Sequence, residues 1–175
     1  FHFGSALGTK LELSDPAVVT VDGSEMSWRP ALAYYERDFA GVLGNAEFEY
    51  SDIDGNSFVN NVVVAKSIDL LTNPDPLKKG SAYTLTWIGD PIGTDETINV
   101  TVNGPNEGDA KLFSSTDPGA TSIILEADKI NGLGSGTGKI IIERYKQQTL
   151  QEGTSKGGAV WSRYFSKTIN IEIQD

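Results

Sequence analysis

The chain has 175 residues, of which 38% are hydrophobic and 22% are charged, and its 24 acidic and 14 basic side chains give a formal net charge of −10. This composition is too apolar for a disordered chain, and the length allows one domain, or two small ones, to bury a core without disulfides or metals. The negative charge disfavours nucleic acid as a partner. There is no Cys and the one His is His2, which excludes thiolate metal sites and leaves a Ser-His-Asp triad dependent on the second residue.

No stretch of the chain approaches the about 18 consecutive apolar residues that a membrane span needs. Polar residues interrupt the run from residue 59 to residue 71. We therefore expect no membrane insertion. The chain starts at Phe1 without a basic and apolar leader, which indicates either that a signal peptide has been removed or that the sequence was shortened. We favour removal and expect an extracellular or cell-surface protein, although the absence of Cys fits a cytosolic protein as well.

Residues 1–9 are predicted to form an apolar N-terminal arm, in which Phe1, Phe3 and Leu7 are set off by glycines. Chain ends usually fray unless something holds them. The simpler interpretation is an end strand in the protein's own sheet. The sharper hypothesis is that the arm adds a strand to a neighbouring subunit and covers an exposed sheet edge, with Phe1, Phe3 and Leu7 as the assembly residues.

The first half of the chain carries weak strand patterns. Strands are predicted at residues 10–13, 17–21, 46–50 and 57–65. Residues 30–40 allow two interpretations, because Leu32, Tyr35 and Phe39 recur at helical spacing, yet only about two helical turns would fit. We predict either a short helix or an irregular strand there.

The second half alternates apolar and polar residues with the period of two that is typical of half-buried strands. In residues 82–88, Tyr83, Leu85 and Trp87 share one face, which predicts that Trp87 lies in the core. Further strands are predicted at residues 97–102, 111–113, 121–126, 139–145, 159–166 and 168–173. Turn residues separate these strands, and residues 127–133 are predicted to form one short helical turn.

Short strands with turn signals about every ten residues predict an all-β fold. We expect an antiparallel β-sandwich of the immunoglobulin-like, Greek-key or jelly-roll type, with at most one or two short helical turns. Residues 10–175 are predicted to form a single sandwich. The alternative is two small β domains split at residues 73–80, where two prolines and a glycine interrupt any strand.

One segment is a candidate calcium site. Asp52, Asp54 and Asn56 place oxygen-bearing side chains at alternate positions, and calcium takes about six to eight oxygen ligands. The spacing departs from that of an EF-hand loop, which has its Gly one residue later and a Glu at the twelfth position. The alternative is a hairpin turn, because Asp54-Gly55 is a strong hairpin signal. We expect no other cofactor.

An acidic loop is a second candidate site. Asp90, Asp95 and Glu96 lie between two of the clearest predicted strands, and loops at the end of a sandwich often bind ligands. These carboxylates could hold calcium or accept hydrogen bonds from a sugar. The alternative is a solvated loop that keeps the protein soluble.

Aromatic side chains form the third candidate site. Trp161, Tyr164 and Phe165 come from a predicted strand that carries rings on both faces, so at least one ring is expected at the surface. A sugar or a subunit contact would each explain an exposed ring. Asn99-Val100-Thr101 is a glycosylation sequon whose Asn is expected to point outward.

These observations favour a non-enzymatic, extracytoplasmic structural or adhesive protein, with a filament or surface-assembly subunit as its specific form. The expected partners are further copies of the chain or other surface proteins. The alternative is a carbohydrate-binding module, calcium-dependent or not, with a glycan as the partner. A hydrolase that uses two carboxylates is a third class, since a fold alone never excludes an active site.

Overall fold

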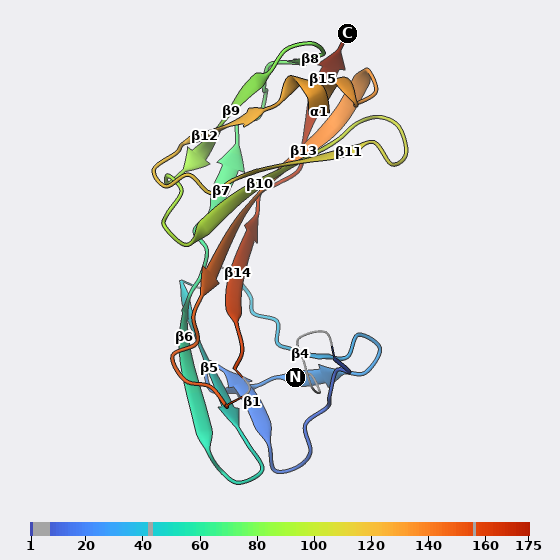
Figure 1. Cartoon of the computed structure of the whole chain (residues 1–175). Coiled ribbons are helices and arrows are strands. Elements are labelled where there is room, and N and C mark those ends of the chain that lie inside the picture. The colour runs from blue at the N-terminus through green and yellow to red at the C-terminus, as the bar shows by residue number, and fades with distance from the viewer. Residues whose placement is uncertain (2–7, 42–43, 156) are drawn as a thin grey trace. The chain divides into compact units, whose positions relative to one another are not determined.

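The computed structural model describes residues 1, 8–41, 44–155 and 157–175, and these residues form fifteen strands and one short helix (Figure 1). All but one of the strand pairings with a described register are antiparallel. The prediction of an all-β, sandwich-like fold with a short helical turn is confirmed. The type of sandwich stays a prediction. Within the described ranges, no helix is long and apolar enough to cross a bilayer.

The chain divides into two compact units. Unit 1 comprises Phe1–Val64 and Gln148–Val160, and unit 2 comprises Ala65–Gln147 and Trp161–Asp175. The segment 73–80, where the alternative of two domains placed the split, lies inside unit 2. The number of independently folding domains stays a prediction.

Unit 1 contains one four-stranded antiparallel sheet in the order β2-β1-β5-β6, and a separate hairpin of β3 and β4. The strands are β1 (Val18–Val21), β2 (Ser24–Glu25), β3 (Ser27–Arg29), β4 (Tyr34–Glu36), β5 (Asn45–Ser51) and β6 (Ser57–Val63). The turn between β5 and β6 contains Gly55 at a φ of 81°, a conformation that glycine adopts readily. The predicted Asp54-Gly55 hairpin is therefore confirmed.

Aromatic rings supply much of the packing in unit 1. Tyr50 stacks on Phe58 with 5.9 Å between ring centroids, and Phe1 contacts Tyr50 at 4.8 Å and Tyr35 at 6.0 Å. The backbone N–H of Leu11 donates to the Phe1 carbonyl at 3.0 Å. Phe1 thus lies against its own unit. The other predicted assembly residues, Phe3 and Leu7, lie outside the described residues.

One prediction for the first half of the chain was wrong, because residues 10–13 form no regular strand. Of the two interpretations of residues 30–40, the structure agrees with the irregular strand, since the segment contains a turn followed by β4. The N–H groups of Leu32 and Ala33 both donate to the Arg29 carbonyl, which closes the turn that joins β3 to β4. Tertiary pairing of Trp28 with Tyr35 in this hairpin overrides a helical pattern only two turns long.

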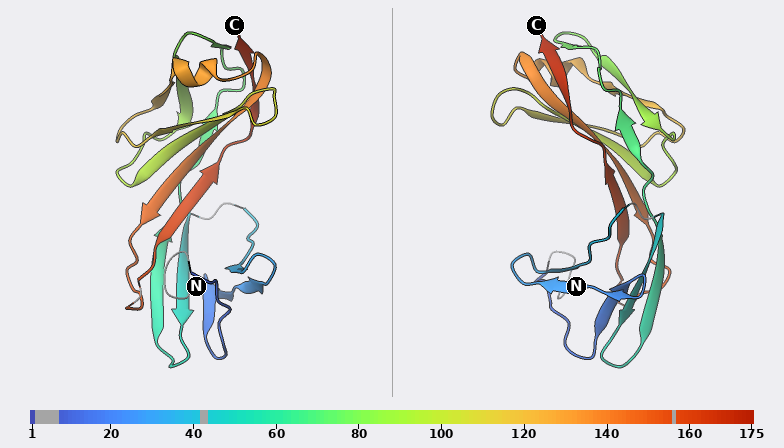
Figure 2. Two further views of the ribbon diagram at one scale, coloured as in Figure 1. Left: turned by 45° about the vertical axis from the view of Figure 1, so that its right-hand side comes forward. Right: turned by 180° about the vertical axis from the view of Figure 1, so that it is seen from behind.

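Unit 2 contains two sheets, which are visible in Figures 1 and 2. The larger has the order β11-β10-β13-β15-β8, with β14 also paired to β13, and the smaller has the order β12-β9-β7. The elements are β7 (Ile68–Leu70), β8 (Leu77–Lys78), β9 (Tyr83–Gly89), β10 (Glu96–Asn103), β11 (Ala110–Ser115), β12 (Ser122–Leu125), α1 (Ala127–Asn131), β13 (Gly136–Gln148), β14 (Val160–Phe165) and β15 (Ile169–Gln174). The predicted strands of the second half are thereby confirmed, with shifted ends.

The hydrophobic core of unit 2 comes from the alternating residues of these strands. Ile98, Val100 and Val102 on β10 are fully buried, and Leu85 and Trp87 on β9 belong to the same cluster. The prediction that Trp87 lies in the core is confirmed. Because side chains alternate along a strand, the residues between these buried positions point to the outer face of each sheet.

Candidate functional site

The outer face of the larger sheet in unit 2 carries a row of four hydrogen-bonded polar side chains from four strands. Ser114 of β11 donates its hydroxyl to Asn99 Oδ1 at 2.7 Å, and Asn99 Nδ2 donates to Glu143 Oε2 at 3.2 Å. Arg163 of β14 donates its Nε–H to the other oxygen of Glu143. We call these four residues the polar ladder.

Strand register brings the members of the ladder together. Asn99 is paired with Ser114 on one side and with Glu143 on the other, so three side chains meet on one face. Asn99 lies between the buried Ile98 and Val100 and so points outward, as the alternation predicts. Each oxygen of the nearly buried Glu143 carboxylate has a donor, so the charge of this group is compensated within the row.

Two large aromatic side chains flank the ladder on β14. Trp161 is 56% exposed and Phe165 is 53% exposed, and they lie on either side of Arg163 in the alternation of the strand. The Arg163 guanidinium lies over the Phe165 ring, 5.5 Å from its centroid. Tyr164 points the other way and packs against the core. Of the three predicted surface aromatics, Trp161 and Phe165 therefore lie at the surface.

The ladder and its two rings form a surface that can contact a ligand in two ways. The exposed rings offer flat apolar area, and Arg163 and Asn99 offer planar hydrogen-bonding groups. The ladder itself holds one carboxylate, whereas glycoside hydrolysis uses two, so its groups suit binding better than acid–base chemistry. We call this surface, made of the polar ladder with Trp161 and Phe165, the ladder face.

Glu96 of the predicted acidic site points into the protein. It is 8% exposed and forms an ion pair with Arg144, which is 0% exposed. The same Glu96 oxygen accepts the Gly93 N–H at 2.9 Å, and Arg144 Nη1 also donates to the Pro91 carbonyl at 3.2 Å. Glu96 and Arg144 together thus hold the loop between β9 and β10, and the carboxylate has its donors inside the protein.

The other two acidic residues of this loop remain at the surface. Asp90 accepts a bond from Lys66, and this contact lowers the pKa of the Asp90 carboxyl and raises the pKa of the Lys66 amine. Asp95 is exposed, and its backbone carbonyl accepts the N–H of Gln147 at 3.1 Å. The structure therefore separates the buried Glu96 from the exposed Asp90 and Asp95.

Asp52 anchors the turn between β5 and β6. One of its carboxylate oxygens accepts the N–H groups of Asp54 at 3.0 Å and Asn56 at 2.9 Å, and the other accepts Asn56 Nδ2 at 2.9 Å. The bond from the Asn56 side chain is the main cause that lowers the pKa of Asp52. The predicted calcium residues thus form an Asx-type turn. No group of three or more His, Cys, Asp or Glu that could hold a metal occurs in the described ranges.

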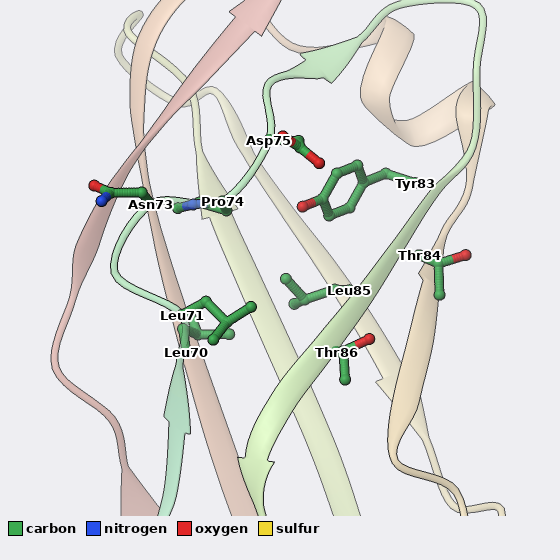
Figure 3. Close-up of a pocket in the computed structure, with 9 residues that line it drawn as sticks. All are labelled: Leu70, Leu71, Asn73, Pro74, Asp75, Tyr83, Thr84, Leu85 and Thr86. Carbon is green, nitrogen blue, oxygen red and sulfur yellow. The ribbon is translucent and has the colours of Figure 1, made fainter.

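A pocket of about 220 Å³ lies beside β9 in unit 2 (Figure 3). Residues 83–86 of β9 form one wall, and Leu70, Leu71 and residues 73–75 form the other. Burial and the Asp75 carboxylate raise the pKa of Tyr83, which lines the pocket. The pocket arises because β7 pairs with β9 only as far as Leu70, after which the chain leaves the sheet. Its volume is below the about 300 Å³ typical of small ligand sites.

Sequence reasoning did not find this pocket or the ladder. The prolines at 74 and 76 were the signal that the chain leaves the sheet beside β9. For the ladder, Asn99 and the strand of Trp161 were recognised separately, but Ser114, Glu143 and Arg163 carry no local motif.

Comparison with known proteins identifies no relative of this chain: no family model, no curated protein and no solved structure matches it.

Proposed function

We propose that this chain is a non-enzymatic, extracytoplasmic structural or adhesive protein of the cell surface or extracellular space, and that its contact surface is the ladder face. The observation that carries the proposal is the pair of exposed rings, Trp161 and Phe165, beside an ordered polar row. Trp, Phe and Arg are enriched where proteins bind partners, and here two rings and an Arg lie together on one strand face. Surface proteins or further copies of the chain are the expected partners.

The ladder face suits binding because much of it is ordered before a partner arrives. Asn99 and Glu143 are held by neighbours on both sides, so they lose little conformational freedom on contact. Glu143 engages the Nε–H of Arg163, and a guanidinium has five N–H donors in all. Arg163 can therefore bond a partner without breaking the ladder.

Truncation of both rings tests the proposal. We expect Trp161→Ala with Phe165→Ala to weaken retention of the purified protein on the surface of intact cells by at least about tenfold, the usual effect of losing a binding hot spot. Ile124→Ala is the matched control, since Ile124 is 61% exposed on β12 of the other sheet. Unchanged retention of the double variant would refute the ladder face as the contact surface.

A carbohydrate-binding module is the second candidate function, with a glycan as the partner. It is supported by the alternation of β14, which places Trp161 and Phe165 on the same face as Arg163, each two residues away. Ring faces therefore lie beside hydrogen-bonding groups, as sugar recognition requires. A glycan array with and without EDTA tests it. Binding that disappears in the Trp161→Ala variant would support this function, dependence on EDTA would identify a calcium-dependent module, and silence across the array would contradict it.

A filament assembled through residues 1–9 is the specific form of the structural role. Deletion of residues 1–8 should leave a folded monomer that no longer polymerises. Light scattering measures the outcome, and unchanged polymerisation would show that the arm is not the assembly element.

A further inference from the structure

Within the described residues, the outer edge of β6 in the unit 1 sheet is capped by side chains rather than paired with another strand. β6 pairs with β5 on one side, and residues 148–152 lie along its other side. Gln148 Oε1 accepts the Val63 N–H at 2.9 Å while its Nε2 donates to the Val63 carbonyl at 2.9 Å. Likewise, Gln151 Oε1 accepts the Asn61 N–H at 2.9 Å and its Nε2 donates to the Asn61 carbonyl at 3.3 Å.

These contacts reproduce the hydrogen bonds of an antiparallel strand. In a hydrogen-bonded pair of antiparallel strands, each residue donates its N–H to the carbonyl of the residue opposite and accepts that residue's N–H at its own carbonyl. A glutamine amide offers one acceptor and two donors in a plane, so a single side chain can replace the opposing peptide group. Val59, two residues further along, donates its N–H to Glu152 Oε2 at 2.7 Å. The groups satisfied belong to Val59, Asn61 and Val63, the alternate residues that face away from β5.

The sequence of β6 carries none of the usual protections of an edge strand. Natural edges avoid pairing with other chains through charged side chains, proline or bulges. The seven residues of β6, SFVNNVV, contain no charge and no proline, and three of them are the β-branched residue valine. The side chains of residues 148–152 are therefore the protection of this edge, and they act through exposed hydrogen bonds that water can replace.

The free edge of β6 is also complementary to itself. If two β6 strands pair antiparallel about a two-fold axis at Asn61, Asn61 meets its own copy, and Val59 meets Val63 of the other strand. Every outward N–H and C=O of these three residues then has a partner. Valine lies opposite valine on one face, which is a favourable cross-strand contact. The contact is isologous and closes at two chains.

We propose that β6 is a self-association strand, that its partner is β6 of a second copy of this chain, and that Gln148 and Gln151 keep it closed in the monomer. This inference rests on unit 1 alone and is independent of the ladder face. It also differs from assembly through residues 1–9, because it needs no part of the arm.

Removal of the two caps tests the inference. In sedimentation velocity, Gln148→Ala with Gln151→Ala should dimerise at least tenfold more tightly than the unmodified chain. Gln147→Ala is the matched control, because Gln147 is the exposed neighbour of Gln148 at the end of β13. Adding Asn61→Pro to the double variant should restore the monomer, since proline removes the central N–H that the dimer needs and is tolerated at a sheet edge.

Cross-linking gives a second measurement, because the chain has no cysteine of its own. Paired Asn61 residues would have Cα atoms about 5.5 Å apart, within the range of a disulfide. Asn61→Cys in the Gln148→Ala, Gln151→Ala variant should therefore oxidise to a dimer at least tenfold faster than Thr116→Cys, placed in an exposed loop of unit 2. If the double variant does not fold, as judged by circular dichroism, Gln151→Ala alone serves as the background. A folded variant that stays monomeric and cross-links no faster than Thr116→Cys overturns the proposal.

Discussion

The buried ion pair between Glu96 and Arg144 provides the strongest prediction of stability. Arg144 has no exposed surface, and its charge is balanced by one carboxylate that is itself nearly buried. The Nε of Arg144 has no hydrogen-bond partner within the described residues, so the burial of this guanidinium is already costly. Glu96→Gln keeps the shape of the side chain and its bond to Gly93, but removes the balancing charge.

The expected loss in the free energy of unfolding depends on whether a variant leaves a buried charge without its partner. Breaking a buried pair by removing one partner costs about 3–5 kcal/mol, so Glu96→Gln and Arg144→Met should each lower the free energy of unfolding by that amount. Removing both charges together leaves neither one buried without its partner, and such a replacement is often neutral or stabilising. Glu96→Gln with Arg144→Met keeps the bond to Gly93 but takes a donor from the Pro91 and Asp90 carbonyls. The Asp90 carbonyl retains the Trp87 Nε1–H, so the added cost is about 1–3 kcal/mol for Pro91 if water does not replace its donor. The double variant should thus lose less than either single variant.

Urea denaturation of the four proteins, followed by circular dichroism, measures this double-mutant cycle. We expect a coupling of at least about 3 kcal/mol between the two sites. Single losses below about 1 kcal/mol, or a double loss equal to the sum of the two single losses, would refute the reasoning that an uncompensated charge causes the effect.

Three further predictions concern the backbone, a carboxylate and the ladder face. Gly138→Ala should lower the free energy of unfolding by about 1–3 kcal/mol in urea denaturation, because its Cβ would lie 2.5 Å from the Asn103 carbonyl oxygen; an unchanged midpoint would contradict this. Asp52 should titrate below its usual pKa in an NMR pH series, so its contribution to stability is present above the unfolded pKa of about 3.9 and is lost as the pH falls through the folded pKa. Asn56→Ala should raise that pKa, and no change would show that the amide is not the cause. Trp161→Ala should leave the free energy of unfolding within about 0.5 kcal/mol while weakening ligand retention, and a larger loss of stability would mean that the ring packs in the core.

The sequence and the structure agree where a local pattern decides the outcome. Ile98, Val100 and Val102 were predicted to share a face because side chains alternate along any strand, and all three are fully buried. Asp54-Gly55 was recognised as a hairpin because few residue pairs suit that turn. Where the local signal was only two turns long, at residues 30–40, the structure formed a strand instead of a helix.

The pattern of residues in the chain was therefore sufficient to establish the β-sandwich class, the core face of its clearest strands and the exposure of some aromatic side chains on β14. It could not reveal that Asn99 and Glu143 meet, that Glu96 pairs with Arg144, or that Gln151 caps β6. Each of these contacts joins residues more than 40 positions apart. Alternation decides which face a side chain occupies, whereas strand order and register decide its neighbours, and these depend on packing of the whole unit.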